Sequence, residues 1–87
     1  MKILIVEPGS YPRTAHIPHE LRSMQAVIGG YIQPIYPWDD PVELVCDEDG
    51  LRKHAAFNRF IAPEVAIFGT FFICGWEKRI SQIRPTI

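Results

Sequence analysis

The stretch "VAIFGTFFICGW", residues 65–76, is the most hydrophobic run of the 87-residue chain. β-Branched and aromatic residues dominate it, and these residues favour β-strands. A strand this apolar is typical of one that is covered on both faces. We therefore predict one long, central strand that is the last of its sheet, with Phe71 and Ile73 in the core. Gly69 lies inside the run and indicates a bulge or a close approach of two backbone segments.

Toward the N-terminus, four shorter segments have the composition or the alternation of strands. Pro8 and Gly9 close the first of them in a turn, which predicts a hairpin with the second. Pro34 has no N–H to donate to a sheet, so the third is expected at an edge or a bulge. We also expect Ile5 and Leu44 in the core. The four segments are "KILIV" (2–6), Arg13–Ile17, "YIQPIYPW" (31–38) and "VELVCD" (42–47).

One amphipathic helix is expected over Glu20–Ile28, because Leu21, Met24, Val27 and Ile28 form a single apolar face. Gly29 suits the residue that follows a helix in a left-handed conformation. Residues 51–64 have little pattern and predict a short helix or an irregular loop. The expected fold class is α+β, a mostly antiparallel sheet of four or five strands with one helix packed on one face. Residues 1–87 form one domain, with 77–87 as a loose tail.

The charge of the chain is unevenly distributed, although its net value is only −1. Residues 1–38 carry +1, residues 39–49 carry −6 and residues 50–87 carry +4. A net charge this small removes the simplest electrostatic argument for a nucleic-acid-binding protein. No segment has the roughly 20 apolar residues of a membrane span or the apolar core of a signal peptide, so we expect a cytoplasmic protein and no membrane partner.

The acidic residues of "YPWDDPVELVCDEDG", residues 36–50, stand at the two ends of a predicted strand. Five strand residues separate the two groups by about 17 Å, too far for one shared metal ion. We interpret Asp47, Glu48 and Asp49 as a solvated turn that guards an edge strand, in which Gly50 supplies a positive φ. An acidic face that meets a basic partner is the alternative.

Two groups of residues are candidate binding sites. Tyr36 and Trp38 flank Asp39 and Asp40, and aromatic rings beside carboxylates can stack on a base and accept its amino protons. The alternative is that Trp38 closes one end of the core while the carboxylates cap a turn. Asn58 and Arg59 form the second group, because an arginine fork can grip a phosphate or a carboxylate. An exposed loop arginine that faces solvent is the alternative here. The binding residues are Tyr36, Trp38, Asp39, Asp40, Asn58 and Arg59.

The sequence contains no constellation typical of catalysis. His16, His19 and His54 are scattered without a Cys or Asp pattern beside them, so they predict neither a metal site nor a catalytic triad. Cys46 and Cys74 lack the paired spacing of a zinc site, and we interpret them as buried free thiols. Nucleotide-binding fingerprints are absent from the sequence. We expect no enzymatic activity, no metal and no cofactor.

Several segments, taken in order, resemble the family called domain of unknown function 3846. They are "VEPG", "LRSMQAVIGGYIQPIYPWDDPVELVCDEDG", "NR" and "IFGTFFICG", and together they cover most of residues 1–76. The tail from Trp76 departs from the longer acidic helix that often follows in the family. Members occur widely in phages, plasmids and conjugative elements of bacteria, so the resemblance implies a mobile-element setting. It implies no particular activity.

The function expected from these observations is that of a non-enzymatic accessory protein of a phage or mobile element that acts by binding. Such a protein would serve as an anti-defence inhibitor that blocks a host immune protein or sequesters a small nucleotide signal. Homo-oligomers are compatible with the sequence. The alternative is a small nucleic-acid-binding module that uses the basic residues of the C-terminal half, namely Arg52, Lys53, Arg59, Lys78, Arg79 and Arg84.

Overall fold

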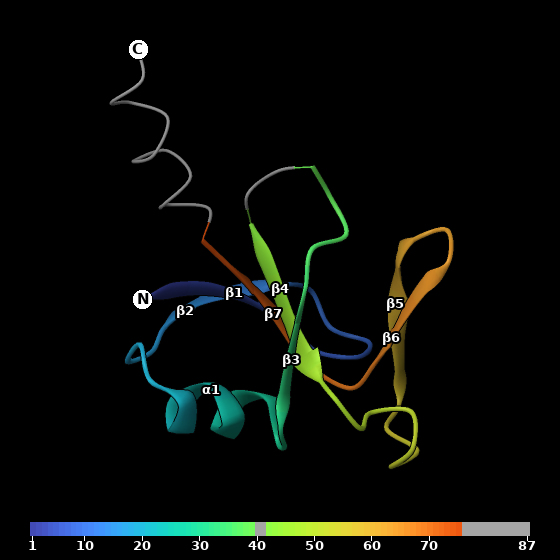
Figure 1. The fold of residues 1–87 in the computed structure, drawn as a ribbon, viewed down its shortest axis with the longest axis horizontal. Coiled ribbons are helices and arrows are strands. Elements are labelled where there is room, and N and C mark those ends of the chain that lie inside the picture. The colour runs from blue at the N-terminus through green and yellow to red at the C-terminus, as the bar shows by residue number, and fades with distance from the viewer. Residues whose placement is uncertain (40–41, 76–87) are drawn as a thin grey trace.

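The computed structural model describes residues 1–39 and 42–75, and these form seven strands and one helix (Figure 1). The predicted tail and Asp40 lie outside the described residues. The elements are β1 (Lys2–Val6), β2 (Arg13–His16), α1 (Leu21–Ile28), β3 (Ile32–Ile35), β4 (Glu43–Asp47), β5 (Phe57–Ala62), β6 (Val65–Phe68) and β7 (Phe71–Cys74).

Five of the strands form one sheet in the order β2-β1-β7-β4-β3, and each neighbouring pair is antiparallel. The predicted α+β class is therefore confirmed, as are the hairpin of β1 with β2 and the edge position of Pro34 in β3. The central position of residues 71–74 is confirmed too, because β7 lies between β1 and β4. The acidic residues beside β4 do not guard an edge, since β4 has a neighbour on both sides.

The apolar run of residues 65–76 does not form a single strand, so that prediction was wrong. Gly69 has a φ of +85°, which breaks the extended backbone between β6 and β7. β6 instead pairs with β5 in a separate two-stranded sheet. The prediction of a helix or loop over residues 51–64 was also wrong, since β5 lies there. Two irregularities in β5, at 57/59 and 60/62, interrupt its alternation and hide the strand from a period-two pattern.

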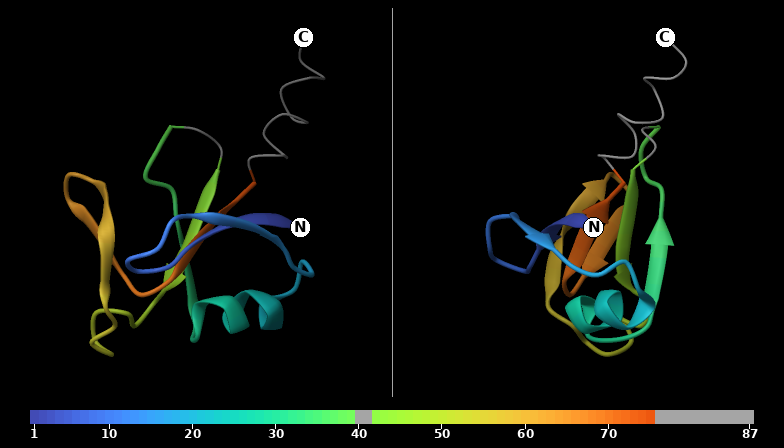
Figure 2. Two further views of the ribbon diagram at one scale, coloured as in Figure 1. Left: turned by 180° about the vertical axis from the view of Figure 1, so that it is seen from behind. Right: turned by 90° about the vertical axis from the view of Figure 1, so that its left-hand side faces the viewer.

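The five-stranded sheet is covered on both faces by different elements. On one face, Ile28 of α1 packs with Ile5, Val45 and Phe72, and Met24 and Val27 add to this cluster. On the other face, Ile67 of the β5–β6 hairpin packs with a cluster that contains Val6, Leu44, Cys46 and Phe71. Figure 2 shows α1 and the hairpin on different sides of the sheet. Neighbouring residues of β7 thus pack into two separate hydrophobic clusters, one on each face of the sheet.

The predicted core is largely confirmed. Ile5, Leu44 and Phe71 are buried, whereas Ile73 is partly buried against the hairpin-side cluster. Cys46 is a buried free thiol, as predicted, whereas Cys74 was predicted to be buried but is only partly buried. Burial, followed by the charge of Asp47, raises the pKa of the Cys46 thiol, which favours the unreactive protonated form.

The helix packs on the sheet through Met24, Val27 and Ile28. Leu21 was predicted to face the core but is 55% exposed, because the helix is anchored at its other end by buried Ile28. Gly29 ends the helix with a φ of 84° and donates its N–H to the Gln25 carbonyl, as predicted for this glycine. Within residues 1–39 and 42–75, no helix is long and apolar enough to cross a membrane.

Candidate functional site

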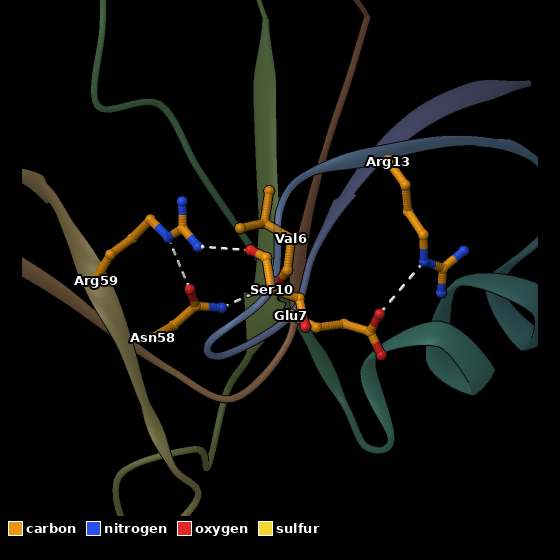
Figure 3. A network of polar contacts seen from close by, with 6 residues as sticks. All are labelled: Val6, Glu7, Ser10, Arg13, Asn58 and Arg59. Carbon is orange, nitrogen blue, oxygen red and sulfur yellow. Dashed lines mark hydrogen bonds and ion pairs between the residues drawn. The ribbon is translucent and has the colours of Figure 1, made fainter.

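Asn58 connects β5 to two distant parts of the backbone. Its Nδ2 donates to the carbonyl oxygen of Val6 (2.9 Å), and its Oδ1 accepts from Arg59 Nε (2.8 Å) (Figure 3). Nδ2 also donates to the carbonyl oxygen of Gly69 at 2.8 Å. The first β5 irregularity falls at this residue and directs its side chain to the end of β1. Because both amide donors are used internally, Asn58 has a structural role that sequence reasoning did not assign.

Arg59 lines a small pocket beside the loop between β1 and β2. Its Nη2 donates to the Ser10 carbonyl oxygen at 3.2 Å (Figure 3). The pocket has a volume of about 300 Å³, and we call it the loop pocket; its lining residues are Gly9, Ser10, Tyr11, Pro12 and Arg59. In the same loop, Glu7 forms an ion pair with Arg13 at 3.3 Å. Of the predicted pair, Asn58 thus makes hydrogen bonds within the protein, whereas Arg59 lines a surface pocket.

The described members of the predicted aromatic and acidic corner differ in their exposure to solvent. Tyr36 is 66% exposed and donates its hydroxyl to Glu43 Oε2 at 3.3 Å, and the negative charge of Glu43 raises the pKa of this tyrosine. Trp38 is partly buried against the hairpin-side core, as the alternative interpretation expected. Asp39 is exposed, and Asp40 lies outside the described residues.

The second acidic group forms a turn with Glu48 exposed, as predicted, but Asp47 departs from the prediction because its side chain is only 6% exposed. Its Oδ2 lies 2.6 Å from Lys53 Nζ, and its Oδ1 accepts the Asp49 N–H at 2.8 Å. Burial raises the pKa of Asp47, but the two hydrogen bonds and the Lys53 charge outweigh it and hold that pKa below its usual value. Lys53 also donates to the Gly29 carbonyl oxygen at 3.3 Å and so links this turn to the end of α1.

Among the basic residues proposed for nucleic-acid binding, those in the described part of the chain make contacts within the protein. Arg52 pairs with Asp49 at 3.1 Å, Lys53 pairs with Asp47, and Arg59 donates to Asn58 and Ser10. The remaining members, Lys78, Arg79 and Arg84, lie outside the described residues. In residues 1–39 and 42–75, no three His, Cys, Asp or Glu side chains are grouped so that they could hold a metal ion.

An exposed cluster of aromatic rings covers the β5–β6 hairpin, and sequence reasoning missed it. Phe57 and Phe60 are 48% and 65% exposed. The ring of Phe57 lies 5.4 Å from that of Phe60 and 5.6 Å from that of Phe68, and both contacts are edge-to-face. We call Phe57, Phe60 and Phe68 the aromatic face. The signal in the sequence was two phenylalanine-bearing segments on either side of the turn residue Pro63, which together could have indicated a hairpin.

Comparison with known proteins gives one family. The family model described as "Domain of unknown function (DUF3846)" matches residues 1–85. The chain belongs to this family. The match runs past Trp76, so most of the tail expected to depart from the family falls within it. Among curated proteins and solved structures, nothing matches this DUF3846 chain.

Proposed function

We propose that this DUF3846 protein is a non-enzymatic accessory protein of a phage or other mobile element, and that it binds another protein through its aromatic face. The proposal rests on the exposure of Phe57 and Phe60 to solvent. Exposed apolar clusters mark interaction surfaces, and aromatic side chains supply much of the binding free energy at such surfaces. The rings are supported from behind, because Ile67 of the same hairpin is buried against the sheet.

The surroundings of the aromatic face favour a protein partner over a nucleic acid. Proteins that stack bases on aromatic rings combine those rings with cations that follow the phosphate backbone. Here Arg52 and Lys53 are paired with carboxylates, and Arg59 lines the loop pocket. The aromatic face is thus uncharged, and it fits an apolar surface on the partner.

The size of the aromatic face favours a concave site on a different protein. A fully exposed phenylalanine side chain has an accessible area of about 200 Å². At the exposed fractions of Phe57 and Phe60, the two side chains together expose about 230 Å². Two copies that paired through this face would bury about 500 Å², well below the roughly 1,200 Å² of a stable interface. The hairpin stands to one side of the sheet (Figure 1), so a pocket on a larger partner can enclose it and bury more.

The mobile-element setting implied by the family resemblance makes a host immune protein the first partner to consider. A non-enzymatic binding protein would inhibit such a partner by occupying its surface. The proposal is therefore an anti-defence inhibitor that blocks a host protein with the aromatic face.

A photo-crosslinking residue placed at position 60 tests this proposal in bacterial host lysate. Leu21 provides a matched control, because it is also a large exposed apolar residue but lies on α1, on the other side of the sheet. We expect one host protein to be crosslinked from position 60 and not from position 21. With that protein purified, Phe60→Asp should weaken binding at least tenfold, and Leu21→Asp should not. Equal crosslinking from both positions, or unchanged binding by Phe60→Asp, would reject the aromatic face as the docking surface.

A further inference from the structure

Arg59 is a partly buried cation without an acidic partner in the described part of the chain. Arg13, Arg52 and Lys53 each have a carboxylate within ion-pair distance, whereas Arg59 donates only to neutral oxygens of Asn58 and Ser10. Its charge is therefore not neutralised within residues 1–39 and 42–75. Because Arg59 lines the loop pocket, that pocket presents a positive charge to a ligand.

The guanidinium of Arg59 is held in a fixed orientation. Nε donates to Asn58 Oδ1 at 2.8 Å, and Nη2 donates to the Ser10 carbonyl at 3.2 Å. Asn58 is itself fixed by its bonds to Val6 and Gly69. These two bonds use two of the five guanidinium N–H groups, and the rest can bind the oxygens of a phosphate. A donor that is already ordered loses less entropy when it binds.

Tyr11 adds an aromatic surface to the same pocket. Tyr11 is 93% exposed and is one of the residues that line the loop pocket together with Arg59. Exposed aromatic rings bind nucleobases by stacking. The volume of about 300 Å³ lies at the lower end of the range for ligand pockets, which favours a mononucleotide over a larger nucleotide. Glu7 of the same loop is paired with Arg13, so its repulsion of an anion is reduced.

We propose that the loop pocket binds a mononucleotide, with its phosphate on Arg59 and its base stacked on Tyr11. This site goes beyond the proposed docking function, because it uses the loop between β1 and β2 rather than the aromatic face. The two activities can therefore be separated by substitution.

Calorimetric titration of the full chain with AMP, GMP, CMP and UMP tests the site. We expect at least one of them to bind with a Kd of roughly 1 mM or tighter, and inorganic phosphate or the matching nucleoside to bind at least about tenfold more weakly. Tyr11→Ala should weaken nucleotide binding about five- to tenfold, since stacking is lost. Tyr31→Ala removes another exposed tyrosine and should have no effect.

Arg59→Gln should abolish saturable binding, whereas Arg22→Gln, on the exposed surface of α1, should leave it unchanged. Because Arg59→Gln can also loosen the loop, Tyr11→Ala is the decisive variant: its ring is exposed, so the fold does not depend on it. Phe60→Asp should bind nucleotide like the parent. Binding by none of the four nucleotides up to about 10 mM, equal binding by nucleoside and nucleotide, or full binding by Tyr11→Ala would each overturn the proposal.

Discussion

At the scale of single residues, Asp47 is the acidic group whose environment differs most from what its sequence suggests. It is almost fully buried, accepts the Asp49 N–H and pairs with Lys53. Asp47→Asn keeps an oxygen for the N–H but leaves Lys53 without its counterion. We expect this substitution to lower the free energy of unfolding by about 1–3 kcal/mol at pH 7. Urea unfolding measures it, with Glu48→Gln as the control on the exposed neighbour.

The pH dependence of this effect follows from the lowered pKa of Asp47. A carboxyl group whose pKa is lower in the folded state than in the unfolded state stabilises the folded protein. This stabilisation is fully present at pH values above the pKa of the unfolded state, about 3.9. That contribution is lost as the pH falls through the folded pKa. The difference between the parent and Asp47→Asn should therefore be constant above about pH 5 and shrink in stronger acid. A difference that stays the same down to pH 2 would mean that Asp47 is not stabilised as an anion.

Individual residues also show why the sites were only partly predictable. Asn58 and Arg59 stand out in the sequence as a polar pair, but the partner of Asn58 is Val6, which is 52 positions away, and no local pattern reports such a contact. Gly50 was expected to supply a positive φ and does not. A Cβ on Gly50 would instead lie 2.6 Å from the Phe68 carbonyl oxygen, so this glycine permits a close tertiary approach.

At the scale of elements, β7 is the strand that joins both cores. Phe71 packs on the hairpin side and Phe72 on the helix side, and both are essentially inaccessible to solvent. We expect Phe71→Ala and Phe72→Ala each to lower the free energy of unfolding by about 3–5 kcal/mol in urea titrations. Tyr31→Ala, an exposed aromatic truncation, is the control. A mild effect at either phenylalanine would show that its cluster is loosely packed.

The elements that were predictable from sequence are those with regular patterns. β1, β2, β3, β4 and α1 have clear alternation or helical spacing and are bounded by proline or glycine. The β5–β6 hairpin was missed for two physical reasons. The irregularities in β5 place Phe57 and Phe60 on one face although their spacing is odd. In addition, β6 and β7 are one continuous apolar run, which only the positive φ of Gly69 divides.

At the scale of the whole molecule, the charge of the protein favours a protein partner over a nucleic acid. The net charge is −1, and Arg52 and Lys53 are paired internally. We expect no binding to duplex DNA or RNA at physiological salt in a gel-shift assay. The affinity of a genuine complex with duplex DNA would fall steeply as the salt concentration rises. The logarithm of the binding constant, plotted against the logarithm of the salt concentration, would have a slope near −0.9 for each phosphate neutralised. A submicromolar complex with that salt dependence would restore the nucleic-acid-binding alternative.

The strand order has a consequence for synthesis on the ribosome. β1 and β4 have no direct pairing with each other in the sheet; both pair with β7, which follows them along the chain. The two N-terminal hairpins therefore leave the ribosome without the strand that joins them, and an isolated two-stranded hairpin is at best marginally stable in water. Translation proceeds from the N-terminus, so the sheet assembles only after Phe71–Cys74 emerge. A chain truncated before residue 71 would lack the strand that joins the β1–β2 hairpin to the β3–β4 hairpin, and we expect proteases to degrade it.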